Sequence, residues 1–167
     1  DSVQRGFLSC LVGLLLVLVF SILFYRVAGM FAMLALGYNL FLILLILSWF
    51  RATLTLPGIA GMVLTIGMAI DASILIFEKV KEEVANGMAF RKALHDGFRG
   101  AMTVIFDSNL TTLGTGVILY YLGGPSIQGF AITLMLGIIA TMLAGVFFLR
   151  SMFDFTLDNT KITRFRL

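Results

Sequence analysis

Charged residues are scarce in this chain, and that scarcity bounds its class. Only 13% of the 167 residues are charged, whereas a soluble domain carries about 25%. Hydrophobic residues make up 60%, and the mean hydropathy is +1.05. This composition excludes an ordinary soluble domain and predicts an integral membrane protein in contact with lipid. The net charge of +3 is too small to indicate a nucleic-acid partner.

Cysteine, histidine and proline are also nearly absent. Cys10 is the only cysteine, so no intrachain disulfide can form. No His and Cys cluster indicates a metal site, and no glycine-rich loop suits a nucleotide, so we expect no cofactor. The two prolines, Pro57 and Pro125, both fall at the start of apolar runs, where a missing backbone N–H costs nothing.

Long apolar runs dominate what remains. Five windows of about 20 residues are long enough to cross a bilayer as helices. We therefore predict an all-α integral membrane protein whose five spans cover residues 7–25, 30–50, 57–77, 101–122 and 127–149.

The basic residues alternate between the connecting segments. One side carries Arg5 and Arg51, whereas the other carries Arg26, Lys79, Lys81, Arg91, Lys92, Arg99, Arg150, Lys161, Arg164 and Arg166. The positive-inside rule places the second set in the cytoplasm. We thus expect residues 1–6 to form an external tail, 7–149 a helix bundle and 150–167 a cytoplasmic tail. A chain that starts outside without an initiator Met also predicts an upstream span.

The stretch 78–100 is too polar to span. Val80 and Val84, then Phe90, Leu94 and Phe98, recur at helical spacing on either side of Asn86-Gly87. This pattern predicts two short amphipathic helices at the membrane surface. A solvated linker with ion pairs such as Lys92 with Asp96 is the alternative.

Two acidic residues, Asp71 and Asp107, fall within spans. Both lie in the cytoplasmic half of the bilayer at similar depth, and no Lys, Arg or His of this chain shares that depth. Carboxyl groups at such depth are costly and usually face a partner or an aqueous path, which favours a proton relay. The alternative is that both are protonated and only donate hydrogen bonds between helices.

Small residues trace two packing stripes, one in the third span and one in the fifth. Small residues occupy every fourth position in both stripes. The first consists of Gly61, Thr65 and Ala69, and the second of Gly129, Thr133, Gly137, Thr141 and Gly145. Such stripes let helix backbones approach closely. We also expect Asn39 to make a hydrogen bond between helices.

The sequence gives little support to an enzymatic function. Two membrane aspartates suggest an intramembrane aspartyl protease, but the run before Asp71 lacks the Gly-x-Gly-Asp motif of such enzymes. We therefore expect a transport protein without an enzymatic site.

Several motifs resemble one family closely. They are ATLTLPGIAG at 52–61, GMAIDASILIFEK at 67–79, ALHDGF at 93–98, DSNLTT at 107–112 and GFAITL at 129–134. Together they resemble the C-terminal membrane region of the SecD family, which belongs to the bacterial protein-export machinery and to the resistance-nodulation-division superfamily. The family usually has Asn where this chain has Ser73, and Arg where it has Lys79.

The resemblance implies a fold, a function and partners. The five spans would be helices 2–6 of a six-helix bundle in the bacterial inner membrane, preceded by a large external domain. The activity implied is proton-driven assistance to protein export, with SecF, the SecYEG channel, YajC and the unfolded exported polypeptide as partners. Asp71 would be the relay residue with Asp107, supported by Ser73, Asn109, Thr111 and Thr112. Alternatives are a lipid or drug exporter of the same superfamily and a purely structural scaffold for the Sec channel.

Overall fold

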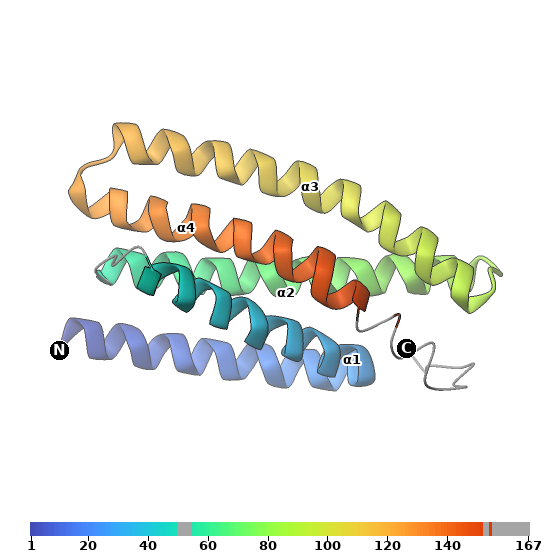
Figure 1. Cartoon of the computed structure of the whole chain (residues 1–167). Helices are drawn as coiled ribbons and strands as arrows, with labels where there is room; N and C mark the ends of the chain where they lie inside the picture. Colours follow the sequence, from blue (N-terminus) through green and yellow to red (C-terminus); the bar gives the residue numbers. More distant parts are fainter. Residues whose placement is uncertain (50–54, 152–153, 155–167) are drawn as a thin grey trace.

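Long helices make up the described part of the chain, residues 1–49, 55–151 and 154 of a computed structural model. Figure 1 shows them side by side as an elongated bundle. They are α1 (Ser2–Trp49), α2 (Leu56–Ala85), α3 (Phe90–Leu122) and α4 (Pro125–Leu143), which the π-helix η1 (Ala144–Leu149) continues. The described ranges contain no strand. The predicted all-α class is confirmed.

Helix α1 contains two membrane spans joined by a sharp reversal. Arg26 interrupts the helix with φ 42° and ψ −109°, a conformation that is costly for a residue with a Cβ. A Cβ on Gly29 would lie 2.5 Å from the Ser21 carbonyl oxygen, so the tight return requires glycine there. Tyr25 packs against the core cluster that contains Ile76 and Phe77, which ties the reversal to α2.

The reversal brings the number of candidate spans within the described residues to five, as predicted. They are Ser2–Arg26, Ala32–Trp49, Leu56–Ala85, Phe90–Leu122 and Pro125–Phe147. Residues 2–6, expected as a tail, already belong to the first helix. Most of the predicted tail 150–167 lies outside the described residues, as do Arg51, Lys161, Arg164 and Arg166.

The segment 78–100 differs from the prediction of two short surface helices. Its first part extends α2 to Ala85 and its second part begins α3 at Phe90, with a turn between them in which Gly87 has φ 89°. The extensions pack on each other: Val80 is buried, and a Cβ on Gly97 would lie 2.8 Å from the Val80 Cα. This close contact buries Val80 and Leu94 of the predicted apolar face, whereas Val84 stays exposed.

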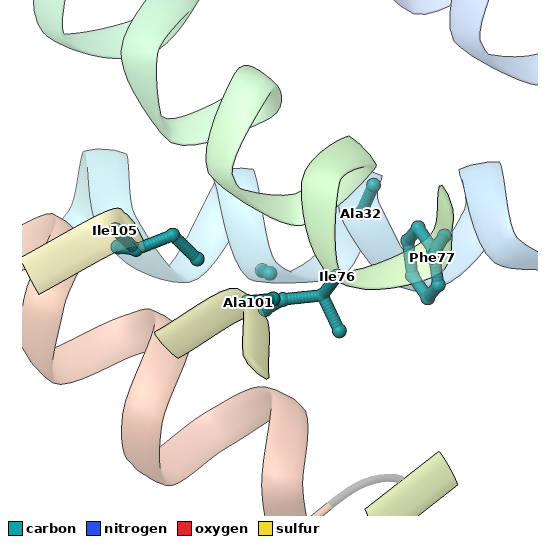
Figure 2. Close-up of a cluster of buried hydrophobic side chains, with 6 residues drawn as sticks. Ala32, Ile76, Phe77, Ala101 and Ile105 are labelled. Atoms are coloured by element: carbon teal, nitrogen blue, oxygen red, sulfur yellow. The ribbon is translucent and has the colours of Figure 1, made fainter. Parts of the chain in front are cut away.

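Helix α2 lies at the centre of the bundle and contacts α1, α3 and α4. Its start is capped by the Thr55 hydroxyl, which accepts a hydrogen bond from the Gly58 N–H at 3.2 Å. Near its other end a core cluster joins three helices (Figure 2): Ala32 and Ala35 from α1, Ile76 and Phe77 from α2, and Ala101 and Ile105 from α3. This cluster holds α2 and α3 in the register that forms the site described next.

Candidate functional site

Asp71 lies in a cleft between α2 and α3. Met68, Asp71, Ala72 and Leu75 line one wall, and Val104, Ile105, Ser108 and Asn109 line the other. The cleft has a volume of about 150 Å³, room for several water molecules. Asp71 is exposed at the surface of the described chain, whereas Asn109 is buried against α2. The cleft therefore presents one carboxyl group and two further polar side chains amid apolar walls.

The polar motif 107–112 is divided between two faces of α3. Ser108 and Asn109 point into the Asp71 cleft, but Asp107 is exposed and does not line it. Residues two apart on a helix point in nearly opposite directions, about 200° apart, so Asp107 and Asn109 cannot share a face. The structure thus brings Asp71 together with Asn109 and not with Asp107. Ser108, which was not predicted as a site residue, lines the cleft as well.

Asp71 and Asp107 nevertheless lie at the same depth. Helices α2 and α3 run in opposite directions (Figure 1), and each aspartate is about 22 Å along its helix from the end formed by Leu56 and Leu122. In a hydrocarbon core of about 30 Å, both carboxyl groups are well inside the bilayer. The ion pairs of the described residues are Lys79 with Glu82 and His95 with Asp96, so neither Asp71 nor Asp107 takes part in one.

The remaining motif residues mainly bond their own helices. The Ser73 hydroxyl donates to the Ala69 carbonyl at 3.1 Å and is buried on the face opposite Asp71. Thr111 and Thr112 donate to the carbonyls of Asp107 and Ser108 at 2.9 and 3.0 Å. Thr111 is exposed beside Asp107, one turn away. None of these hydroxyls lines the Asp71 cleft.

The two small-residue stripes face each other across α2 and α4. A Cβ on Gly61 would lie 3.1 Å from the Phe130 carbonyl oxygen, and one on Gly137 would meet the Thr65 side chain. Gly129 approaches Thr55 in the same way, and Ala69 is buried next along the stripe. This contact determines how α2 is rotated about its axis. Asp71 lies about 200° around the helix from Ala69, so the face of α2 that packs on α4 is opposite Asp71.

Known proteins share both the sequence and the fold of this chain. Residues 2–157 match the family described as Protein export membrane protein SecD/SecF, C-terminal. A protein translocase subunit SecD from Rhodothermus marinus is 51% identical over 161 residues, which cover 96% of this chain and 26% of that protein. The SecD from Pseudomonas aeruginosa is 47% identical over 152 residues, or 91% of this chain and 24% of its own length.

A solved structure has the same fold as this chain. The crystal structure of SecDF from Thermus thermophilus, a translocon-associated membrane protein, matches with a TM-score of 0.90 and 38% identity, covering 96% of this chain and 22% of that one. The chain therefore spans about a quarter of the length of the relatives it matches. The resemblance deduced from the motifs is confirmed: this chain belongs to the SecD/SecF protein-export family and corresponds to its C-terminal membrane region, on the SecD side of the family.

Proposed function

We propose that this chain is the membrane part of a protein translocase subunit that uses the proton motive force to assist protein export. The observation that carries the proposal is Asp71, a carboxyl group about 22 Å into its span, exposed in a cleft with polar Ser108 and Asn109. An exposed carboxyl group at hydrocarbon depth is costly, about 2.5–3.5 kcal/mol on insertion scales, and is tolerated where a partner or water meets it.

Asp71 is the proposed proton carrier, and Asn109 and Ser108 are positioned to hold water or a hydrogen-bond partner beside it. Asp107 lies outside the cleft, on the outward face of α3, and Thr111 lies one turn from it on the same face. We propose that the homologous membrane half of SecF covers the exposed aspartates and supplies a basic side chain. Moving one charge through 100 mV yields about 2.3 kcal/mol, which shifts a two-state equilibrium about fiftyfold.

The wider assignment follows from the same proposal. The complete protein would act at the inner membrane with the SecYEG channel and YajC on unfolded exported polypeptide, with H⁺ as the coupling ion. The N-terminus of this segment would face outward and residues 78–100 the cytoplasm, as the distribution of basic residues indicates.

The test is Asp71→Asn in the complete protein, with Asp96→Asn as the matched control. Asp96 undergoes the same chemical change but lies partly exposed near the start of α3, outside the cleft. We expect Asp71→Asn to abolish export that depends on the proton motive force and to leave assembly with SecF unchanged, while Asp96→Asn exports normally. Export and proton conduction that survive Asp71→Asn would overturn the relay and favour a structural scaffold.

A further inference from the structure

A second hollow, at the other end of α3, combines arginines with apolar side chains. It has a volume of about 680 Å³ and lies between the first turns of α3 and the segment that follows α4. Arg91, Arg99 and Arg150 supply positive charge, His95 adds a titratable ring, and Asp154 is the acidic residue of its wall. All three arginines are exposed. The positive charges of this groove outnumber its one negative charge.

On α3 the arginines of the groove lie toward the start of the helix, and the wall beyond Arg99 is apolar. Arg91, His95 and Arg99 follow one face of α3 at four-residue spacing, and Met102 and Phe106 continue the same face. At 1.5 Å per residue, Arg91 and Arg99 are about 12 Å apart along the axis, and Phe106 lies about 10 Å beyond Arg99. Val146 adds to this apolar wall, and Leu94 and Phe98 place apolar side chains between the arginines. The basic part is nearer the helix start and the apolar part is deeper in the bundle.

We propose that this groove binds an anionic phospholipid, with the phosphate against Arg99 and Arg150 and an acyl chain along Met102, Phe106 and Val146. Basic pockets between membrane helices suit the headgroups of anionic lipids. Three arginines against one carboxylate complement a negatively charged headgroup, and arginine binds phosphate with paired N–H groups. A free phosphate would occupy only the basic part and leave the apolar wall unfilled.

The depth of the groove agrees with this occupant. The headgroup region of a bilayer is several Å thick on each side, and the hydrocarbon begins below it. A chain that enters beside Arg99 would follow the span of α3 inward. The lipid site needs only that α3 crosses a bilayer. Its assignment to the cytoplasmic leaflet rests in addition on the orientation under the proposed function.

The experiment compares lipid retention by the complete purified protein in native mass spectrometry, with phosphatidylglycerol and phosphatidylcholine offered in equal amounts. The test variant is Arg99→Gln with Arg150→Gln. The matched control is Arg5→Gln with Lys92→Gln, which removes two positive charges outside the groove. We expect the double groove variant to lower the ratio of bound phosphatidylglycerol to phosphatidylcholine about 25-fold, fivefold for each arginine. The control should stay within about twofold of the unmodified protein.

Further measurements keep the lipid site falsifiable. Arg99→Lys with Arg150→Lys retains the charge and should retain most of the preference, which separates a lost site from a misfolded chain. An unchanged ratio in the glutamine variant, or an equal loss in the control, would overturn the site. Displacement of phosphatidylglycerol by inorganic phosphate at constant ionic strength would leave only an anion site. Loss of a protein partner with an unchanged lipid ratio would assign the groove to that partner.

Discussion

At the residue scale, two kinds of polar side chain in the spans differ in their roles, besides buried hydroxyls such as that of Ser73, which bond their own helix. Asn39 and Thr141 are buried and connect α1 to α4, because the Asn39 amide donates to the Thr141 hydroxyl at 2.9 Å, as predicted for Asn39. Thr111 has the same chemistry but is exposed and bonds only its own helix. The first group holds helices together, and the second leaves its side chains available to a neighbouring molecule.

Thr141→Val should separate these two roles. Valine keeps the shape of threonine but removes the acceptor of the Asn39 amide. We expect a loss of about 0.6 kcal/mol of stability, the average for such bonds between membrane helices, and at most about 1.7 kcal/mol. Thr111→Val is the matched control and should change stability by less than about 0.5 kcal/mol, because it bonds only its own helix. Reversible unfolding in detergent measures both. Equal effects of the two substitutions would contradict the importance of the Asn39 bond.

At the scale of elements, the contact of α2 with α4 depends on residues without bulk. Gly137 lies against the fully buried Thr65 side chain, and Gly61 lies against the Phe130 backbone. Close approach of this kind gains dispersion energy over the length of both helices, since lipid offers no hydrophobic force to drive them together. The contact orients α2 so that Asp71 faces the cleft with α3.

Gly137→Ala should therefore push the two helices apart. The added methyl group has no room beside Thr65, and overpacking of this kind costs about 1–3 kcal/mol. Gly114→Ala is the control, because a Cβ there meets nothing within 4 Å, and it should gain up to about 1 kcal/mol from helix propensity. Adding Thr65→Ala should restore part of the loss in Gly137→Ala. A stable Gly137→Ala protein with unchanged unfolding would show that the interface adapts.

At the scale of the whole molecule, α3 is the least covered of the three long later spans. In the apolar window of α3, only 17% of the residues are buried. The corresponding share is 44% for α2 and 44% for the span formed by α4 and η1. Its outward residues include Asp107 and Thr111, which lipid tails would solvate poorly. The first half of α1 is even less covered, with 6% buried, but its residues are almost entirely apolar and suit lipid.

This difference predicts where a partner subunit attaches. In the complete protein, Thr111→Cys should crosslink to the neighbouring membrane subunit, and Leu16→Cys on α1 should not. Leu16 is 66% exposed, so both thiols are accessible in this chain and differ only in the polarity of the face around them. Mass spectrometry of the crosslinked product identifies the partner. Crosslinks from Leu16→Cys alone would place the partner on the opposite part of the bundle.

The sequence was enough to predict the class, the five spans and the position of Asp71 within its span. Each of these follows from local quantities: the length of an apolar run and the position of a residue within it. The two stripes were also visible, because small residues repeat at helical spacing, but that they face each other came from the structure. Even the family could be deduced from short motifs such as the run around Asp71.

The tertiary structure alone decided which side chains meet. Only the packing of α2 on α3 shows that Asn109 and Ser108 share the cleft with Asp71 while Asp107 and Ser73 turn elsewhere. It also shows that 78–100 extends two spans instead of lying flat, because Gly97 admits the backbone at Val80. The rotation of a helix about its axis depends on the neighbours it packs against. The hydropathy of one chain segment does not indicate which neighbours those are.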